Sequence, residues 1–396
     1  MIALLFIAAA ASSEPSGFVD EGAASAPVDA PVQSEPAAAV SPLLTKTPWY
    51  QSLEVSGFID VDFALLFPDH TNTFFVGEAE VDIEKKLFDV AALRLDVNLL
   101  RRPPWDPESY GQSGQLVGFG ITPDDLIEQA YADYFPLGEE GPRLRLGKYN
   151  ALVGYERQDP TDRLTTSESL VFIHGSPANF TGLAFQMPLP AGFELMVHLA
   201  YNGWDQGVAS TKTKSIGGQA SWRHRFAKPL QVHATATVLY GNERLAVDKD
   251  GRLSSFFALS LEVQNDFLLA GEATYAREGG VGRAADGTQP GTLNASWFGF
   301  SLWARYRFVS WLAGTIRYDY FSDPSRVRGL AQSAADYLSG GDSQRQQITA
   351  GLAATIVSGA VARLEYTGDF LQSAELSHVR PLARVDRLVL QAVYAF

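Results

Sequence analysis

Acidic side chains recur at every second position in two segments near the start of the chain. They are Asp60 and Asp62 in the first segment, and Glu78, Glu80, Asp82 and Glu84 in the second. Carboxylate oxygens are the ligands that Ca²⁺ and Mg²⁺ prefer. Alternate positions of a strand share one face but stand well apart along it. We therefore expect each acid to be separately hydrated, and we predict an acidic wall with no metal site.

A second concentration of charge lies between residues 151 and 177. It comprises Glu156, Arg157, Asp159, Asp162, Arg163 and Glu168. Two arginines at alternate positions, Arg143 and Arg145, precede it. Opposite charges that face each other across a narrow aqueous gap create a field that acts on passing polar solutes. The same charges could instead merely solvate a surface loop, and the sequence leaves both interpretations open.

Catalysis by a serine nucleophile would need a histidine that a third polar group orients. The chain has six histidines, and the candidate pair of histidine and serine is that of His174-Gly-Ser176. This pair lies in a loop with no evident partner to orient the histidine. We therefore expect no enzymatic activity.

Composition excludes several further classes of protein. The chain has 396 residues, no cysteine, and 45 acidic against 31 basic side chains, for a net charge of −14. Without cysteine there are no disulfides and no thiolate zinc or iron–sulfur sites. An acidic chain without a basic block does not favour nucleic acid as a partner. No apolar run reaches the eighteen or so residues of a membrane-spanning helix.

The elements that must position these charges have a hydrophobic period of two. Between Leu53 and Leu65 apolar residues occupy the odd positions, while Glu54 and Ser56 are among the even ones. Such alternation is typical of strands with one apolar and one polar face. We count about sixteen such segments up to Phe396. One of them, 125–135, fits either orientation of its faces.

The connections between the predicted strands alternate in length. Tight turns follow the even strands, and longer polar loops follow the odd ones, at 100–124, 151–177, 205–213, 241–253, 278–293, 323–342 and 371–382, with 67–72 as a short exception. This asymmetry is typical of outer-membrane barrels, whereas a β-sandwich has no reason to maintain it. We predict an all-β, transmembrane, antiparallel up-and-down β-barrel with short periplasmic turns and long extracellular loops.

The N-terminal part of the chain differs from the rest. Residues 1–13 contain an apolar stretch followed by small residues, which predicts a signal peptide, although a buried N-terminal helix is the alternative. Residues 14–46 are rich in Ala, Pro, Ser and acids and predict a disordered periplasmic tether. The barrel then comprises residues 47–396.

Several motifs resemble the OmpL-like β-barrel porin family of Gram-negative outer membranes. They are Gln129-Ala-Tyr-Ala-Asp133-Tyr-Phe-Pro136, Leu144-Arg-Leu-Gly147-Lys148-Tyr149, Val153-Gly154-Tyr155-Glu156, Ser169-Leu-Val-Phe172, Phe180-Thr-Gly182-Leu-Ala-Phe-Gln186 and Tyr201-Asn202-Gly203-Trp204-Asp205. The alternating C-terminus, which ends in Phe396, resembles the signal that the barrel assembly machinery recognises. The resemblance implies passive diffusion of small hydrophilic solutes through an outer-membrane channel, without a cofactor.

Sixteen strands are enough to leave an aqueous channel. Arginine facing lipid at the midplane would cost roughly 2–4 kcal/mol, so we expect the charged faces to turn inward. By position, 151–177 corresponds to the loop that constricts general porins. The predicted pore-lining and constriction residues are Arg143, Arg145, Glu156, Arg157, Asp159, Asp162, Arg163, Glu168, Asp60, Asp62, Glu78, Glu80, Arg305 and Arg317. A slight excess of carboxylates among the inward positions predicts weak cation preference.

The alternatives to a porin are a barrel with a closed lumen and a barrel hydrolase, and the expected partners are lipid and further copies of the chain. A structural or adhesive barrel with a closed lumen would show the same alternation. A barrel hydrolase is disfavoured because the one His-x-Ser sequence, His174-Gly-Ser176, lies in a loop with no evident partner to orient the histidine. Outer-membrane lipid is the expected partner of the apolar face. Because general porins are commonly trimers, a homotrimer is also open, with Ala350, Leu352, Ala354 and Ala362 as a candidate contact.

Overall fold

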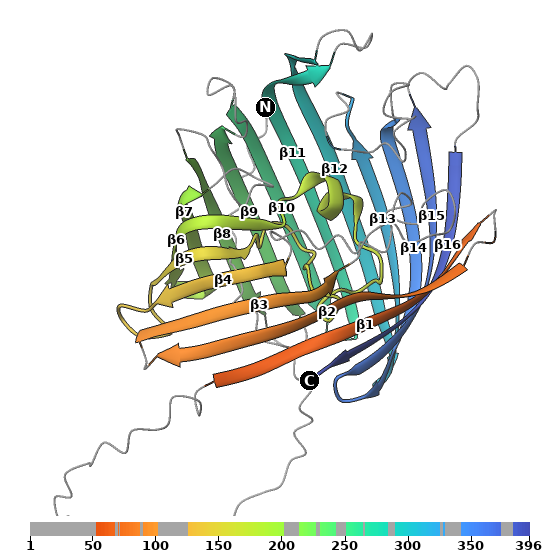
Figure 1. Cartoon of the computed structure of the whole chain (residues 1–396), viewed down its shortest axis with the longest axis horizontal. Coiled ribbons are helices and arrows are strands. Elements are labelled where there is room, and N and C mark those ends of the chain that lie inside the picture. The colour runs from red at the N-terminus through yellow and green to blue at the C-terminus, as the bar shows by residue number, and fades with distance from the viewer. Residues whose placement is uncertain are drawn as a thin grey trace, which may run out of the picture.

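The computed structural model describes residues 53–67, 70, 72–87, 90–101, 126–201, 214–226, 230–242, 251–263, 266–283, 290–324, 328, 342–373 and 383–396. The predicted signal peptide and tether lie outside these residues. Sixteen strands form one closed antiparallel barrel in which each strand pairs with its sequence neighbours and β1 pairs with β16 (Figure 1). Among the described residues, no helix is long and apolar enough to cross a membrane.

The strands follow the predicted segments closely. Their bounds are β1 Leu53–Phe67, β2 Asn72–Leu87, β3 Ala91–Arg101, β4 Ile127–Tyr134, β5 Arg143–Asn150, β6 Asn179–Leu189, β7 Phe193–Tyr201, β8 Ser215–Arg225, β9 Leu230–Asn242, β10 Gly251–Val263, β11 Phe267–Arg283, β12 Pro290–Val309, β13 Leu312–Ser322, β14 Asp342–Val357, β15 Ala360–Ser373 and β16 Ala383–Ala395. The predicted all-β barrel is confirmed.

Alternation places apolar side chains outside and polar ones inside. On β13 Ile316 is 61% exposed on the outer face, while its neighbour Arg317 is fully buried on the inner face. The neighbouring strands β12 and β14 repeat the pattern, with Leu302 and Leu352 exposed on the outer face. An apolar exterior and a polar interior suit a barrel surrounded by lipid.

Among the connections, the one between β11 and β12 differs most from its predicted length. β11 and β12 extend to Arg283 and begin at Pro290, so the predicted loop 278–293 shrinks to residues 284–289. The two strands remain paired past Glu278 through register shifts at Gly282. The extra pairing forms a hairpin that projects beyond the other strands (Figure 1). Backbone pairing thus continues where the apolar alternation ends, because it does not require apolar side chains.

Aromatic side chains gather on the outer face where strands meet the short turns. Phe308 and Trp311 flank the β12–β13 turn, and Tyr394 lies near the chain end. Trp222 stacks on His224, with ring centroids 5.5 Å apart, so this histidine belongs to the outer aromatic band. Such bands occur where a barrel crosses the membrane interface. The last residue is paired as well, since the Phe396 N–H donates to Gly57 O at 3.0 Å.

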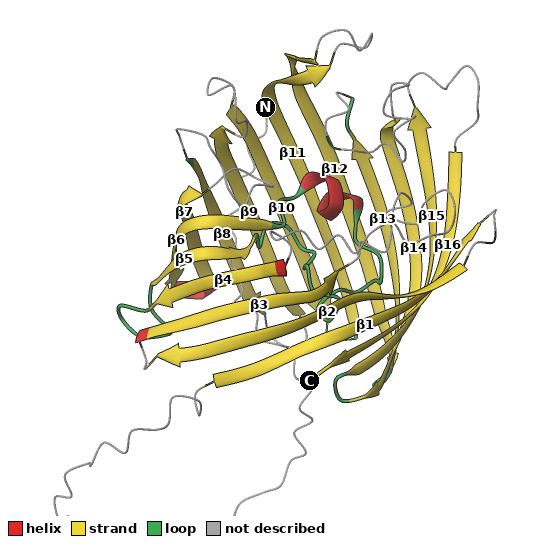
Figure 2. Cartoon of the chain, in the orientation of Figure 1, coloured by secondary structure: helices red, strands yellow, loops and turns green. Residues whose placement is uncertain are grey.

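The segment 151–178 lies inside the barrel. Figures 1 and 2 show it running from β5 into the middle of the ring of strands, where it forms one short helical turn, Val171–Gly175, before β6. That turn packs against β11, β12 and β13. Buried apolar side chains of the segment, such as Val153 and Leu170, join wall residues such as Trp297 and Phe321 in one cluster. We call residues 151–178 the lumen loop.

Candidate functional site

The lumen loop turns away from the wall at Gly154. This residue has a φ of +80°, and a Cβ placed there would lie 2.6 Å from Glu272 Oε2. Glycine alone adopts this conformation without strain and permits so close an approach. The turn therefore directs the loop across the lumen toward β11.

Glu272 of β11 provides the first anchor for the loop. Its Oε2 accepts the backbone N–H of Tyr155 at 2.7 Å, and its Oε1 accepts the Ser169 hydroxyl at 3.1 Å. The Ser169 N–H in turn donates to Glu156 Oε2 at 2.7 Å. One buried carboxylate thus fixes both limbs of the loop.

Arg317 of β13 provides the second anchor. Its guanidinium donates to Thr165 Oγ1 at 2.6 Å, to Ser167 Oγ at 2.9 Å and to the Glu168 carbonyl at 3.0 Å. Its Nε donates to Asp319 Oδ2 at 2.7 Å. A fully buried arginine needs such partners, because an uncompensated buried charge is strongly unfavourable.

Residues of β15 provide a third anchor. Glu365 accepts the backbone N–H groups of Thr166 and Ser167 at 2.6 and 3.0 Å. Arg363 donates to the carbonyl of Arg163 at 3.1 Å. These contacts join positions about 200 residues apart in sequence, so only the closed barrel brings them together.

The helical turn of the loop is fixed at His174. Its Nδ1 donates to the Arg328 carbonyl at 3.1 Å, while its Nε2 accepts a hydrogen bond from Arg345 Nη1 at 3.3 Å. Burial and the nearby Arg345 lower the pKa of His174 to about 3. The imidazole is therefore neutral and acts as a structural hydrogen-bonding group. The predicted pair with Ser176 gains no third group of a triad from these contacts.

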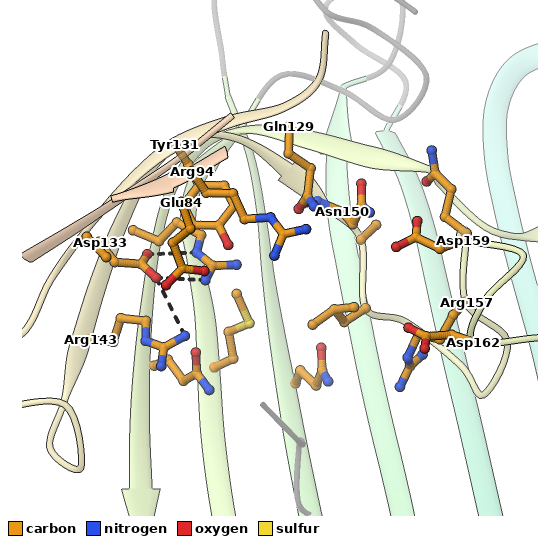
Figure 3. A pocket seen from close by; sticks show the side chains of 18 of the residues that line it. Glu84, Arg94, Gln129, Tyr131, Asp133, Arg143, Asn150, Arg157, Asp159 and Asp162 are labelled. Carbon is orange, nitrogen blue, oxygen red and sulfur yellow. Dashed lines mark hydrogen bonds and ion pairs between the residues drawn. The ribbon is translucent and has the colours of Figure 1, made fainter. Parts of the chain in front are cut away.

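Between the lumen loop and the wall formed by β2–β8 lies a cavity of about 410 Å³. Figure 3 shows Arg94, Asp133 and Arg143 on the wall side, and Asp159 and Asp162 on the loop side. The side chains that line it include Glu84, Lys86, Arg94, Asp133, Glu139, Glu140, Arg143, Arg145, Glu156, Arg157, Asp159 and Asp162. Charged groups of both signs therefore surround the space that the loop leaves free.

The arginines of the wall are held in place by Asp133 of β4. Arg145 makes two hydrogen bonds to this carboxylate, each 2.8 Å long, and Arg143 lies 3.5 Å from it. The Arg145 guanidinium also lies over the Tyr131 ring, 3.9 Å from its centroid. A bidentate pair stacked on an aromatic ring fixes a guanidinium more firmly than either contact alone.

Two acids of the loop, Glu156 and Asp159, are buried near other carboxylates. Burial, together with Glu128 and Glu78, raises the pKa of Asp159 well above its usual range. Burial also raises the pKa of Glu156, and Arg317, whose Nη1 lies 3.8 Å from the Glu156 carboxylate, opposes that rise. The loop therefore carries carboxyl groups that protonate more readily than exposed ones.

The predicted site residues fall into three groups in the structure. Arg143, Arg145, Glu156, Arg157, Asp159 and Asp162 line the cavity. Arg163, Glu168 and Arg317 lie where the loop contacts the β13–β15 wall, and Arg163 pairs with Glu168 at 3.1 Å. Asp60, Asp62, Glu78 and Glu80 are buried on the inner face of β1 and β2, and Arg305 is half-buried on β12.

Several residues of this site were not among the predicted ones. Glu272 and Glu365 anchor the loop, and Arg94 and Asp133 line the cavity. Each occupies an inward position of an alternating strand. That placement is the available sequence signal, but it does not distinguish an anchor from any other inward polar residue.

Comparison with solved structures finds porin-like barrels at low sequence identity. The outer membrane channel DcaP of Acinetobacter baumannii is 14% identical with a TM-score of 0.56, covering 87% of this chain and 97% of that one. OprB of Pseudomonas putida is 10% identical with a TM-score of 0.59, covering 87% and 94%. OmpT of Vibrio cholerae in its trimer form is 13% identical with a TM-score of 0.52, covering 87% and 99%. These likenesses concern the fold.

Sequence comparison gives the family. No curated protein matches the chain in sequence. The model of the family described as "Putative beta-barrel porin-2, OmpL-like" matches residues 63–396, which comprise all of the barrel except its first ten described residues. The chain therefore belongs to this OmpL-like β-barrel porin family and is a porin of the bacterial outer membrane.

Proposed function

We propose that the barrel conducts small hydrophilic solutes and ions by passive diffusion and that the lumen loop forms its constriction. One observation carries the proposal. The loop is bonded to β11, β13 and β15, while the space between it and β2–β8 is lined by charged side chains. A loop held against one wall narrows a channel without filling it. No catalytic step forms part of this function.

The direct test is the conductance of purified, refolded protein in a planar lipid bilayer. An open channel gives discrete current steps that grow with salt concentration. A liposome swelling assay with sugars of increasing size then gives the width of the constriction. A folded protein that gives neither steps nor swelling would favour the alternative, a structural or adhesive barrel with a closed lumen.

The charges along the cavity support a weak preference for cations. Seven carboxylates and five cationic side chains line it. Exposed charges are screened over about 8 Å at physiological salt, so only charges at the narrowest part affect a passing ion strongly. A reversal potential in a KCl gradient measures this preference, and selectivity for chloride would contradict it.

We further propose that the porin assembles as a homotrimer. The solved OmpT neighbour is a trimer, and the outer face of β14 and β15 offers the small residues Ala350, Ala354 and Ala362 beside Leu352. Small side chains allow close approach of two barrel walls. Mild gel electrophoresis with and without heating measures the oligomeric state, and a monomer in the unheated sample would contradict the homotrimer.

The C-terminal residue Phe396 is the proposed signal that the barrel assembly machinery recognises.

A further inference from the structure

The arginines on the wall side of the cavity are already paired with carboxylates of the protein. Arg145 makes two hydrogen bonds to Asp133, and Arg143 lies 3.5 Å from the same carboxylate. Arg94 lies 2.8 Å from Asp96. A guanidinium with a carboxylate beside it attracts a second anion less strongly, because the negative charge of the first one is close by. These pairs make the wall polar, but they limit what each arginine can contribute to binding a charged solute.

Gln158 of the lumen loop has a side-chain amide without a partner. The side chain is 5% exposed and lines the cavity, and neither its Nε2 nor its Oε1 makes a hydrogen bond to a described residue. Its neighbour in the chain is Asp159, which Figure 3 shows on the loop side of the cavity. A buried amide without hydrogen bonds is unfavourable, and folded proteins rarely keep one unless a bound molecule satisfies it. The loop therefore presents a free donor and a free acceptor at the cavity.

On the wall side of the cavity, four inward side chains of neighbouring strands form one row. The pairing register places Arg143 of β5 beside Gln186 of β6, and Gln186 beside Met196 of β7. Met196 in turn lies beside Gln219 of β8, which is 4% exposed. All four residues line the cavity. Adjacent strands are about 4.8 Å apart, so the row extends over roughly 15 Å and contains a guanidinium, an amide, an apolar thioether and a second amide.

Amides on both sides of the cavity suit a solute that carries hydroxyl groups. A glutamine carbonyl accepts hydrogen bonds and its NH₂ group donates them, while a hydroxyl does both, so one amide can bind two neighbouring hydroxyls. Met196, Leu152 and Phe172 supply apolar surface in the same cavity. A sugar ring has hydroxyls around its edge and C–H groups on its faces. Its edge therefore matches the amides, and its faces match the apolar side chains.

We propose that the cavity is a binding site for a neutral sugar, in which Gln158 and Gln219 bind hydroxyl groups and Met196 contacts a face of the ring. The cavity volume of about 410 Å³ lies within the range of about 300–1,000 Å³ that is typical of small-molecule sites. This volume suits one or two sugar rings. The inference rests on the proposed function, because the sugar reaches the cavity through the channel, and it names sugars as the preferred solutes among those that the channel admits.

The experiment is saturation-transfer NMR with D-glucose and sucrose as probes. The refolded full chain is kept in lauryldimethylamine oxide, a detergent without a sugar head group. Wild type should bind at least one of the two sugars saturably, with a Kd on the order of millimolar, as expected for a ligand of this size. Glycine, a zwitterion, and succinate, a dianion, should bind about tenfold more weakly, because the arginines of the wall are already paired.

The variant Gln158→Leu separates a binding role of the amide from a structural one. It should weaken sugar binding about two- to tenfold, the range for one lost hydrogen bond. Its thermal unfolding midpoint should be unchanged or higher, because the substitution removes a buried amide that has no partner. An amide that only holds a structural water would give a lower midpoint and unchanged sugar affinity. Gln231→Leu is the matched control on the inner face of β9, outside the cavity lining, and should bind sugar as wild type does.

The remaining outcomes also decide the inference. If Gln158→Leu does not fold, Gln219→Leu replaces it with the same expectation for binding. Absence of saturable binding of both sugars by wild type, tighter binding of glycine or succinate, or undiminished binding by the folded variant would overturn the inference. Bilayer conductance keeps the two proposals apart. A conducting channel that binds no sugar would overturn this inference alone, whereas sugar binding without conductance would contradict the proposed function alone.

Discussion

The backbone N–H of Tyr155 lies 2.7 Å from the carboxylate of Glu272, although 117 residues separate them in the chain. This hydrogen bond spans the barrel from the end of β5 to β11. The same carboxylate accepts the Glu156 N–H at 3.3 Å and the Ser169 hydroxyl. One inward side chain of the opposite wall thus accepts hydrogen bonds from three groups of the lumen loop.

Replacing Glu272 with alanine should loosen the loop. The substitution leaves the buried N–H groups of Tyr155 and Glu156 without an acceptor, at a cost of about 1–3 kcal/mol for each unsatisfied group. We expect severalfold higher open-channel current noise and a changed mean conductance in single-channel recordings. Glu54→Ala removes one exposed carboxylate at the start of β1 and should leave the noise unchanged. Equal noise in wild type and Glu272→Ala would contradict the anchoring role.

The double substitution Arg143→Ala/Arg145→Ala should increase preference for cations. It leaves Asp133 charged but without its guanidinium partners beside the cavity. One charge acting on an ion about 4 Å away in water is worth about 1 kcal/mol, so the ratio of potassium to chloride permeability should change severalfold. Reversal potentials in a KCl gradient measure it.

A matched control for the arginine variant removes two guanidinium groups elsewhere. Arg225 bonds to Gln231 and Arg307 to Asp266, both beside the short turns and outside the cavity lining. Arg225→Ala/Arg307→Ala should shift the reversal potential much less. An unchanged reversal potential in Arg143→Ala/Arg145→Ala would remove these arginines from the constriction.

Acidification should loosen the loop through His174. Its pKa is about 3 when the loop is docked, against about 6.5 for an exposed imidazole. The released loop therefore binds a proton below pH 6.5 that the docked loop does not. The contribution of His174 to the free energy of loop docking is complete above pH 6.5. It decreases by about 1.4 kcal/mol for each pH unit between pH 6.5 and about pH 3.

A histidine variant separates this effect from that of the acids. Glu156 and Asp159 have raised pKa values, so the docked loop takes up protons as the pH falls, and their contribution has the opposite sign. His174→Gln removes the titratable imidazole and leaves the two acids unchanged. Between pH 7 and pH 4, current noise should rise less in His174→Gln than in wild type, and identical pH profiles would refute the role of the histidine.

The outer face should reject charge at mid-barrel height. Ile316 lies in the middle of β13 and points outward. Arginine there should cost about 2–4 kcal/mol of folding stability in lipid, measured by urea titration of refolding into vesicles. Gln186→Arg places the same charge beside the cavity on the inner side of β6 and should cost less. An equal loss in the two variants would contradict the assignment of faces.

The strands could be predicted because successive residues of a strand face opposite sides of the barrel wall, so apolar and polar residues alternate in the sequence. Ile316 and Arg317 are neighbours in sequence and lie on opposite sides of the wall, so the pattern alone separates them. Glu128 shows where this reasoning fails, because a register shift in β3–β4 buries two consecutive side chains, Glu128 and Gln129. For the same reason sequence left the orientation of 125–135 open.

The contacts of the loop could not be predicted from the sequence. Its charged composition and its place after β5 indicated a role in the lumen, and the structure places it there. Its partners Glu272, Arg317 and Glu365 lie on β11, β13 and β15, far along the chain from the loop. Their proximity depends on the closure and curvature of the barrel, which no local pattern records. In the same way, Glu78 and Glu80 of β2 come within 4.8 Å of Glu128 of β4 only because β3 pairs with both strands.

The central claim is that an open lumen passes beside the lumen loop, and a single introduced thiol tests it most directly. The chain contains no cysteine, and Asp162 is an exposed residue of the loop that lines the cavity. In single-channel recordings of Asp162→Cys, a charged methanethiosulfonate reagent should lower the current step. Val238→Cys, on the lipid-facing side of β9, should not respond. An unchanged current in Asp162→Cys, with the thiol shown to be modified, would contradict the account.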